Sequence, residues 1–570
     1  MSKQALREWF LKRDLTAVAV ALVGLIFGLW FLGPRNILPG TTAWLNRGDL
    51  AAYQVTSEFF RSTPLIQWPL TAIQQYGVGW QTTTVSIYGE SLIGIPLKFV
   101  NGLLPMGFQY IGFWIVSCFI LQGYFAAKLL SLFVTNEAQR FLASFIFLFS
   151  PTLVFRIGIA GHSGLGAHWI ILCALYLYFR SRQSYVAWSI LLFIAISTHF
   201  YFFAMIFLVF LAALVKVLLS QSDERKIHRF AQLALWPLLV TTIGFFVMGY
   251  WELRSSAAGV GFFRLNALAF LNPGFSAQDS FSFFLNRFGP LRTRQLFAEE
   301  GEGFQYLGLG TILTIPLLVV FMARDRSPTW WRTVVPLLSV CVSLFLVALS
   351  NRVAIVRHEF SYWLPDSILD LRQTFRAATR FAWPLYYLLT LAGVVAVVRL
   401  VRRVRIATIF VLILLSVHVF DQLPGIAYAH RELSTERPYQ SPLVDPAWNE
   451  IASSYKKINL VPTFDVQSDD LPIDASLWVD SGNWLDFVRF AAKNRLSTNI
   501  AYVGRPVTKY VTRDNARMTR DLMSGNLEEN VVYAFSNRET WNSARQKLSS
   551  GSRAIIIDGF YIILSPLDSD

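Results

Sequence analysis

Apolar runs alternate with short basic clusters along the first 420 residues, and this alternation is the dominant pattern of the chain. A membrane-spanning helix needs about 20 mostly apolar residues, and Lys and Arg gather in the loops that stay on the cytoplasmic side. The pattern predicts eleven spans, at about 15–33, 107–133, 141–157, 166–179, 184–199, 201–219, 230–250, 306–323, 333–349, 382–398 and 406–421. We therefore predict a polytopic α-helical membrane protein.

Two long apolar stretches decide the number of spans. The stretch Ser184–Leu219 has 36 residues between basic residues at 180–182 and at 225–229. At about 1.5 Å per residue it is too long for one crossing. Since both flanks are basic, both are expected in the cytoplasm, and the chain should turn near His199. The same reasoning predicts a hairpin over 141–179.

The charge pattern also predicts which segments face outward. We expect a cytoplasmic N-terminus followed by an uncleaved first helix, so that residues 34–106, 251–305, 350–381 and 422–570 lie outside. The cytoplasmic loops are short, and they contain neither a Walker motif nor a Rossmann glycine fingerprint. Any chemistry is therefore expected on the outer face.

The predicted domains are a membrane domain, 1–421, with a long first outer loop at 34–106, and an extracytoplasmic domain, 422–570. In the second domain, β-like and helical patterns alternate, which predicts a small α/β fold. The β-like runs are 457–461, 499–503, 530–535 and 553–564, and the helical ones are 485–493 and 539–548. A binding or lid role and a purely structural role both stay open for this domain.

Composition narrows the class of protein further. The chain is 54% hydrophobic with a net charge of +14, whereas residues 422–570 carry 16 basic and 18 acidic side chains. The excess positive charge thus lies in the membrane domain, as orientation by basic loops requires, and nucleic-acid binding is not expected. Cys118, Cys173 and Cys341 all lie in apolar runs, so no disulfide framework is predicted.

Two carboxylates of the first outer loop are candidate catalytic residues. Asp49 follows Asn46-Arg47-Gly48 just before a helical pattern, so it is either a general base or metal ligand, or the N-cap of that helix. Glu90 precedes the apolar segment 92–104, which we expect to be interfacial. A carboxylate there is either a second acid or the partner of an Arg.

Histidines near the outer ends of predicted spans are candidate substrate contacts. His162 and His168 accompany Arg156, and His199 accompanies Tyr201. Imidazoles suit proton transfer or phosphate contact, although backbone carbonyls can equally satisfy single histidines. The six-residue separation of the first two does not favour zinc, and no metal site is predicted.

A basic segment before the tenth span is the best candidate for an anion site. Arg372, Arg376 and Arg380 recur every fourth residue, which places them on one helix face, and guanidinium groups suit phosphate oxygens. Compensation by Asp366, Asp370 or lipid headgroups is the alternative. Glu302, within the glycine-rich run 301–308, is a candidate element of a substrate loop.

Several short motifs occur in an order that resembles a known family. They are Gly48-Asp49, Arg61-Ser-Thr-Pro64, Phe108-Gln109-Tyr110, Gly161-His162, Ala167-His168-Trp169, Gly301-Glu-Gly-Phe-Gln-Tyr-Leu-Gly308, Phe375-Arg376-Ala377, Arg380-Phe381 and Trp383-Pro384-Leu-Tyr-Tyr387. Together they resemble an uncharacterised family of bacterial multispanning proteins allied to the GT-C glycosyltransferases. The resemblance covers nearly the whole chain.

The resemblance implies an inverting glycosyltransferase of the bacterial inner membrane. It implies transfer of a sugar from a polyprenyl-phosphate donor to an envelope glycan, lipid or protein on the outer face. Asp49 would be the base, and Arg376 or Arg380 would hold the carrier phosphate, with Arg372 and Arg156 as further phosphate contacts. No Asp-x-Asp stands at Asp49, so no cofactor is certain and a divalent cation stays open.

Two other functions stay open on the sequence alone. A transporter or flippase for a lipid-linked glycan would need charged groups or broken helices at mid-membrane depth, and the predicted spans are almost free of central charge. A non-catalytic assembly subunit for cell-envelope polysaccharide would use its C-terminal domain to bind a partner. Membrane lipids are expected partners in every case.

Overall fold

The fold is described from a computed structural model. It describes residues 14–86, 90–105, 107–219, 226–252, 263–276, 279–288, 302–324, 328–355, 358–365, 375, 377–466, 471, 473–503 and 508–568. The chain divides into two compact units, which we call the helical unit and the mixed unit. The helical unit comprises Met1–Thr41, Tyr110–Gly244 and Ala258–Glu436, and the mixed unit comprises Thr42–Gln109, Phe245–Ala257 and Arg437–Asp570.

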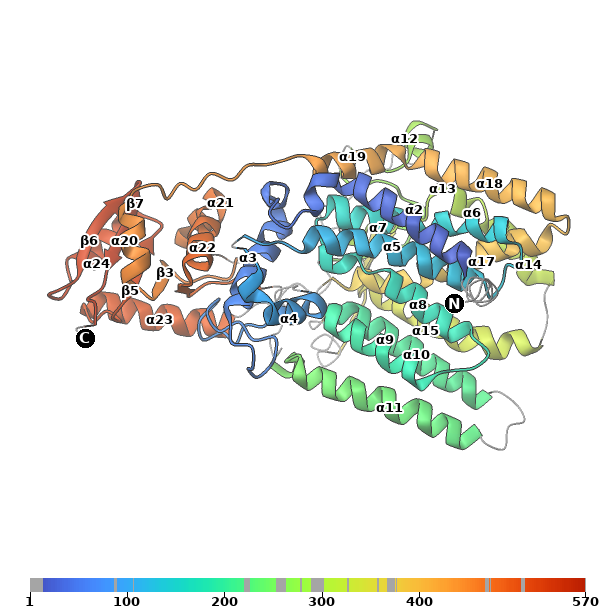
Figure 1. The fold of residues 1–570 in the computed structure, drawn as a ribbon, viewed down its shortest axis with the longest axis horizontal. Coiled ribbons are helices and arrows are strands. Elements are labelled where there is room, and N and C mark those ends of the chain that lie inside the picture. Colours follow the sequence, from blue (N-terminus) through green and yellow to red (C-terminus); the bar gives the residue numbers. More distant parts are fainter. Residues whose placement is uncertain are drawn as a thin grey trace, which may run out of the picture. The chain divides into compact units, whose positions relative to one another are not determined.

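Each predicted span coincides with one helix or with two consecutive helices, most of them shown in Figure 1. They are α2 (Leu15–Leu32), α5 (Ile111–Leu130), α6 (Glu137–Leu148), α7 (Pro151–Val154), α8 (Trp169–Phe179), α9 (Tyr185–Thr198), α10 (Phe200–Leu219), α11 (Lys226–Val247), α13 (Leu309–Ile312), α14 (Ile315–Arg324), α15 (Pro328–Leu349), α17 (Trp383–Leu400) and α18 (Val404–Asp421). Among the described residues, eight helices are long and apolar enough to cross a membrane. Three shorter apolar helices, Ser163–Phe179, Tyr185–Thr198 and Leu309–Arg324, coincide with the other predicted spans. The multispanning helical fold is therefore confirmed, while the number of crossings and their sidedness stay predictions.

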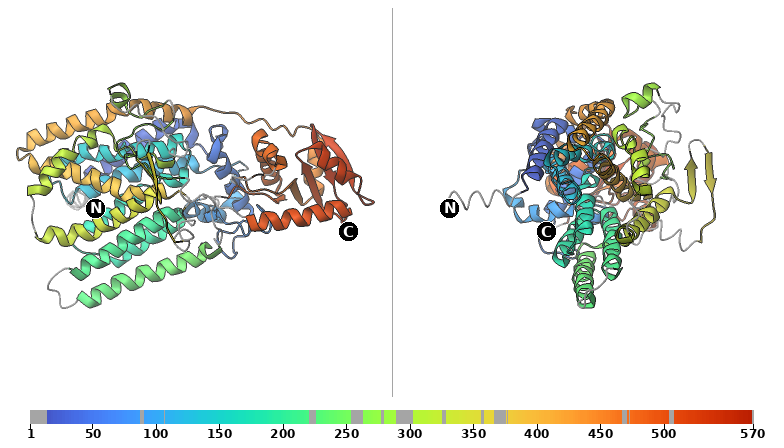
Figure 2. Two further views of the ribbon diagram at one scale, coloured as in Figure 1. Left: turned by 180° about the vertical axis from the view of Figure 1, so that it is seen from behind. Right: turned by 90° about the vertical axis from the view of Figure 1, so that its right-hand side faces the viewer.

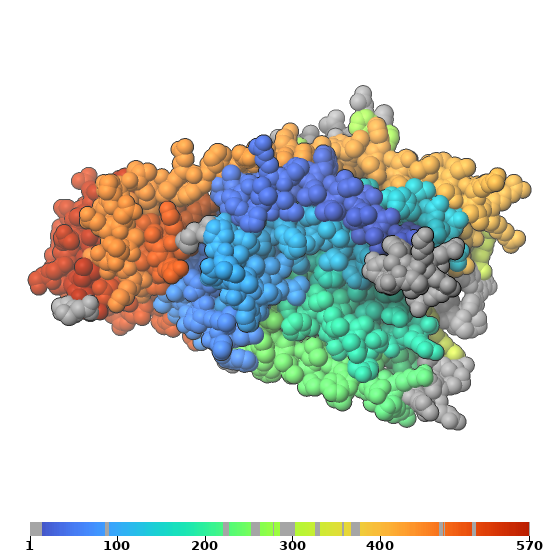
Figure 3. All heavy atoms as spheres, in the orientation of Figure 1, coloured from blue at the N-terminus to red at the C-terminus, as the bar shows by residue number. Residues whose placement is uncertain are grey.

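Helix α2 packs closely on α5 because small residues line the contact. A Cβ added at Gly24 would lie 2.4 Å from the carbonyl oxygen of Phe119, and one at Gly123 would lie 2.8 Å from that of Val20. Glycines at such points let two helix backbones approach, as is common between membrane helices. Figure 3 shows α2 at the surface of the helical unit, which fits a helix that is buried on one side and apolar all round.

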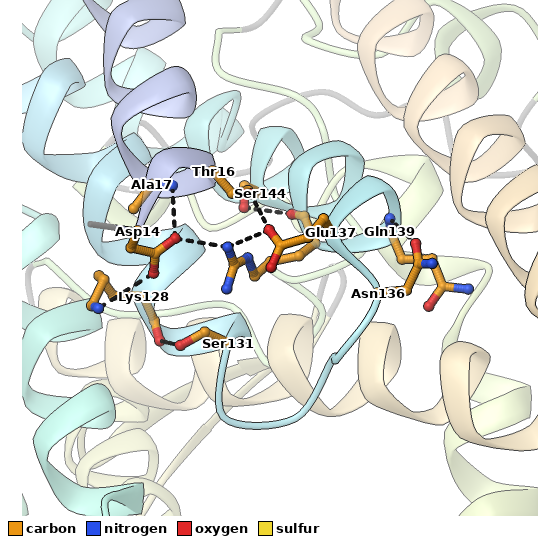
Figure 4. Close-up of polar contacts among 10 residues, drawn as sticks. Asp14, Thr16, Ala17, Lys128, Ser131, Asn136, Glu137, Gln139 and Ser144 are labelled. Carbon is orange, nitrogen blue, oxygen red and sulfur yellow. Dashed lines mark hydrogen bonds and ion pairs between the residues drawn. The ribbon is translucent and has the colours of Figure 1, made fainter. Parts of the chain in front are cut away.

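A cluster of two acids and two bases joins α2, α5 and α6 at one end (Figure 4). Asp14 is the N-cap of α2, because its Oδ1 accepts a hydrogen bond from the Ala17 amide at 3.2 Å. Arg140 Nη2 lies 2.7 Å from Asp14 Oδ1 and also pairs with Glu137, while Lys128 Nζ lies 3.3 Å from Asp14 Oδ2. The two positive and two negative charges balance, so we interpret this cluster as a structural contact between the helices and not as an anion site.

The helical unit also carries a β-hairpin that the sequence pattern did not indicate. Strands β1 (Arg352–Ile355) and β2 (His358–Ser361) pair in antiparallel fashion, and Figure 2 shows them beside the helices. Glu359 on β2 accepts from Arg264 at 2.6 Å and from Arg352 at 2.7 Å. The pair with Arg264 fixes the hairpin to the loop that precedes α12 (Phe283–Phe288), and the pair with Arg352 joins the two strands.

The mixed unit is built on a five-stranded sheet with the order β4-β3-β5-β7-β6. Its strands are β3 (Lys457–Val461), β4 (Ser497–Thr498), β5 (Val531–Phe535), β6 (Arg553–Ile557) and β7 (Phe560–Leu564). Strands β4, β3 and β5 are parallel, and β7 pairs antiparallel with both β5 and β6. The hairpin turn at Asp558-Gly559 has positive φ at both residues, as a tight two-residue turn requires. The predicted α/β fold is confirmed.

Helices from both ends of the sequence surround this sheet. They are α20 (Ala447–Ser454), α21 (Ile473–Ser481), α22 (Asn483–Asn494), α23 (Thr508–Ser524) and α24 (Arg538–Arg545), together with α3 (Gly48–Ser62) and α4 (Ser91–Phe99) from the first outer loop. Phe59 and Tyr76 share one apolar core with Leu460 and Val532. The loop also extends the sheet, because the Thr498 amide donates to the Gln75 carbonyl oxygen at 2.8 Å.

The compact units therefore differ from the predicted division of the chain. Residues 42–109 group with the C-terminal domain, since their apolar side chains complete its core. The helical unit continues to Glu436, because α19 (Leu423–Ser434) packs against α2 and against residues 151–159.

Candidate functional site

A buried ionic cluster in the helical unit joins three segments that are far apart in the sequence. Arg156 Nη1 donates to Glu302 Oε2 at 2.7 Å, and Arg156 Nη2 donates to the Glu302 carbonyl oxygen. Arg380 Nη2 donates to the same Oε2 at 3.0 Å, and His162 Nε2 lies 3.6 Å from Oε1. Three of the predicted site residues thus meet around the carboxylate of a fourth, Glu302. We call these four residues the Glu302 cluster.

Local backbone features hold these side chains in place. Arg156 lies on a π-helical turn, η5 (Phe155–Ile159), in which the Ala160 amide donates to the Phe155 carbonyl oxygen at 2.9 Å. Such a turn inserts one extra residue into a helix and often occurs at functional sites. Thr379 Oγ1 donates to the Glu302 carbonyl oxygen at 2.8 Å, which fixes Glu302 to the short helix η9 (Ala378–Ala382).

Opposite charges meet closely in this cluster. Burial disfavours the ionised form of Glu302, but Arg156, Arg380 and His162 together hold the pKa of this carboxyl well below its usual range. The Arg156 side chain is fully buried, and that of Arg380 is 5% exposed. Two guanidinium groups thus share one carboxylate oxygen. The same fork geometry suits a phosphate.

Aromatic rings flank the two arginines. Arg380 lies 4.7 Å from the ring centroid of Tyr201, and Arg156 lies 5.8 Å from that of Trp383. Both distances are within the range of cation–π attraction. The Tyr201 hydroxyl accepts a hydrogen bond from the Ala377 amide at 2.8 Å, so the ring is fixed. The Tyr201 ring therefore forms one side of the Glu302 cluster, in contact with Arg380.

The other two predicted histidines have structural partners. His168 Nδ1 lies 2.8 Å from the Tyr387 hydroxyl, and its ring centroid lies 4.2 Å from that of Trp383. His199 Nδ1 accepts a hydrogen bond from the Tyr201 amide at 3.2 Å, at the start of α10. His168 thus packs against the Trp383 ring, and His199 positions Tyr201. Arg372 and Arg376, together with Asp366 and Asp370, lie outside the described residues.

Asp49 lies in the mixed unit, in the first turn of α3. The N-cap interpretation is wrong, because the helix begins at Gly48 and Arg47 is the residue at the N-cap. Asp49 Oδ1 instead accepts a hydrogen bond from the Tyr502 hydroxyl at 2.5 Å. The ring of Tyr502 stacks on Trp484, with the ring centroids 6.1 Å apart. The C-terminal domain therefore orients the candidate base.

Glu90 lies in the same unit, at the N-cap position of α4. Its residue is 1% exposed, and its carbonyl oxygen accepts from the Gly94 amide at 2.9 Å. Helix α4 and the short helix η4 (Asn101–Leu103) occupy the segment that we predicted to be interfacial. Within the described ranges, no group of three or more His, Cys, Asp or Glu residues is arranged to hold a metal ion.

One buried carboxylate of the helical unit was not anticipated from the sequence. Asp421 Oδ2 accepts from the Tyr306 hydroxyl at 2.6 Å and from the Leu309 amide at 3.4 Å. Its Oδ1 accepts from the Ser282 hydroxyl and from the Phe284 amide at 3.3 Å. Asp421 thus accepts hydrogen bonds from backbone amides at the N-termini of α12 and α13, where the helix dipole favours a negative charge. No local motif marks this role.

Replacing Asp421 with Asn should lower the free energy of unfolding by about 1–3 kcal/mol. The amide would turn an N–H group toward donors and leave at least one buried donor without an acceptor. Thermal unfolding of the purified protein in detergent measures the effect. The exposed residue Glu436, changed to Gln, is the matched control, and equal unfolding temperatures for the two variants would contradict the clamp role.

Comparison with known proteins identifies the family. No curated protein matches the sequence. The crystal structure of ArnT from Cupriavidus metallidurans in the apo state aligns over 98% of each chain, with 13% identity and a TM-score of 0.42. A similarity of this size assigns no activity. Residues 447–566 match the DUF6311 C-terminal domain, and residues 21–422 match the domain of unknown function DUF6311. The resemblance to an uncharacterised family is confirmed: the chain belongs to the DUF6311 family.

Proposed function

We propose that this protein is a membrane glycosyltransferase that uses a polyprenyl-phosphate-linked sugar on the outer face of the membrane. The observation that carries the proposal is the Glu302 cluster, in which two buried arginines share one carboxylate within a unit of apolar helices. Ionisable groups buried beside membrane-spanning helices are costly and often mark a substrate site. A phosphate on a lipid carrier is an anion that can reach such a site from the membrane.

The cluster offers a phosphate specific hydrogen bonds. The Nε atom of Arg156 is buried and has no hydrogen-bond partner among the described residues. A phosphate oxygen could also share the guanidinium donors that now bind Glu302. Charge-assisted pairs of this kind are about twice as strong as neutral hydrogen bonds. Tyr201 and Trp383 would flank the carrier with apolar surface.

Asp49 is the proposed general base, as the family resemblance implies. The acceptor hydroxyl oxygen would attack the anomeric carbon while the bond from that carbon to the phosphate oxygen breaks. The hydroxyl proton would pass to Asp49, the polyprenyl phosphate would leave with the electron pair, and the anomeric configuration would invert. The hydrogen bond from Tyr502 holds the carboxylate in one orientation.

A transfer assay with the full-length protein in lipid vesicles tests the proposal. Labelled polyprenyl-phosphate sugars and envelope glycan, lipid and protein acceptors should yield a labelled acceptor and free polyprenyl phosphate in equal amounts. Movement of intact labelled glycolipid across the vesicle, without release of carrier phosphate, would contradict transfer and support a transporter. If neither transfer nor movement occurs with any donor, the proposal fails and an assembly role gains support.

Replacing Arg380 with Lys should raise the KM for the lipid donor about tenfold. Lysine keeps the charge opposite Glu302, so folding should be preserved, but it loses the planar fork that binds phosphate. Steady-state kinetics with varied donor concentration gives the value, and thermal unfolding checks the fold. An unchanged KM for the donor would show that Arg380 does not contact the carrier phosphate.

A further inference from the structure

The mixed unit contains a polar cavity of about 220 Å³ that none of the candidate chemistry uses. It is lined by Glu58, Arg61 and Ser62 at the end of α3, by Asn101 of η4, and by Ala492 and Arg495 at the end of α22. Glu58 lies nine residues beyond Asp49 along the same helix, which is about 13 Å at 1.5 Å per residue. The cavity is therefore separate from the candidate base.

Glu58 presents a carboxylate to the cavity. The structure gives it one hydrogen bond, from Gln54 Nε2 to Oε1 at 2.7 Å. Burial raises the pKa of Glu58, although the Gln54 hydrogen bond and the charges of Arg61 and Arg489 act in the opposite direction. Within the described part of the chain, this carboxylate therefore keeps acceptor capacity that no side chain satisfies.

Arg61 forms a fixed wall of the same cavity. Its residue is 8% exposed, and its three nitrogens donate to neutral acceptors: Nε to Asn101 Oδ1 at 2.9 Å, Nη1 to the Phe108 carbonyl oxygen at 3.1 Å, and Nη2 to the Pro105 carbonyl oxygen at 3.2 Å. Asn101 Nδ2 donates back to the Arg61 carbonyl oxygen at 2.9 Å. The wall is thus organised before any ligand arrives.

The mixture of charges selects the kind of ligand. A free anion would be repelled by Glu58 and would meet an Arg61 side chain that already donates to three neutral acceptors, while a free cation would be repelled by Arg61 and Arg495. A neutral molecule with several hydroxyl groups satisfies both signs, because each hydroxyl can donate to the carboxylate and accept from the guanidinium or amide groups. The volume lies below the roughly 300 Å³ at which sites for drug-sized ligands begin, so one ring fills it.

We propose that this cavity binds a single neutral saccharide ring. Glu58 would accept hydrogen bonds from two adjacent hydroxyls, the exposed Arg495 side chain would donate to another from the rim, and Leu104 would contact the ring carbons. The assignment of this ring to the acceptor glycan rests on the proposed function. The binding of the saccharide does not, because it needs no transfer step.

Ligand-detected NMR on the full-length protein in nanodiscs tests the binding. Methyl glycosides of glucose, galactose, mannose and N-acetylglucosamine are the probes, and at least one should bind with a millimolar Kd. Glu58→Gln and the cavity-filling Ala492→Phe should weaken that binding about tenfold or more. Glu450→Gln and Lys493→Phe, both at exposed positions, are the matched controls and should bind as the unaltered protein does.

Three outcomes would overturn the inference: no probe binds, both cavity variants bind as well as the controls, or inorganic phosphate displaces the sugar competitively. Arg495→Ala guards against a folding artefact. Because the Arg495 side chain is exposed, its removal should weaken sugar binding without changing thermal unfolding. Sugar binding without any transfer would leave the inference standing and refute the proposed function. Transfer with no binding at Glu58 would refute the inference alone.

Discussion

Replacing Glu302 with Gln should lower the free energy of unfolding by about 3–5 kcal/mol, the usual cost of removing one partner from a buried ion pair. Arg156 and Arg380 share the Oε2 atom of this carboxylate, and both side chains are almost fully buried. Without the carboxylate, two guanidinium charges would face each other in a low-dielectric surrounding. The carboxylate that compensates their desolvation would then be lost.

Thermal and denaturant unfolding in detergent measure this loss. Glu137→Gln is the matched control, since Glu137 also pairs with an arginine but its side chain is 67% exposed, and it should cost less than about 1 kcal/mol. The double variant Glu302→Gln with Arg380→Gln should recover part of the loss, because one of the two positive charges that faced the carboxylate is removed. Equal stability of Glu302→Gln and the exposed control would show that the arginines find other partners.

The Glu302 cluster shows how far the sequence could predict the site. Arg156, His162, Glu302 and Arg380 were each singled out, because ionisable groups next to apolar runs are chemically conspicuous. Their pairing was not predictable, since Glu302 lies 146 residues from Arg156 and 78 from Arg380. The π-helical turn that carries Arg156 leaves no mark in the apolar pattern of its span.

The features of the fold that could be predicted are likewise those that depend on residues close together in the sequence. Spans and the β6–β7 hairpin were predictable because each depends on a short run of residues and its flanks. The union of residues 42–109 with the C-terminal domain was not, because apolar residues such as Phe59 indicate that a helix face is buried without indicating against what. Tyr502 as the partner of Asp49, 453 residues away, belongs to the same class.

Replacing Asp49 with Asn should reduce the rate of sugar transfer about 10²- to 10⁴-fold, the range that a positioned general base contributes. Asn keeps the size of the side chain but cannot accept the proton of the acceptor hydroxyl. The fold should survive, because a first-turn carboxylate stabilises a helix by only about 0.3–1 kcal/mol. The loss should therefore appear in kcat, with unchanged thermal unfolding.

Tyr502→Phe separates the base from its orientation. This variant keeps the ring that stacks on Trp484 and removes only the hydroxyl that donates to Asp49, so the rate should fall several-fold and remain far above that of Asp49→Asn. Asp480→Asn, at an exposed position of α21, is the matched control and should transfer normally. Undiminished transfer by Asp49→Asn would show that Asp49 is not the general base. Equal losses in Asp49→Asn and Tyr502→Phe would show that Asp49 acts through its hydrogen bond to Tyr502 and not by accepting a proton.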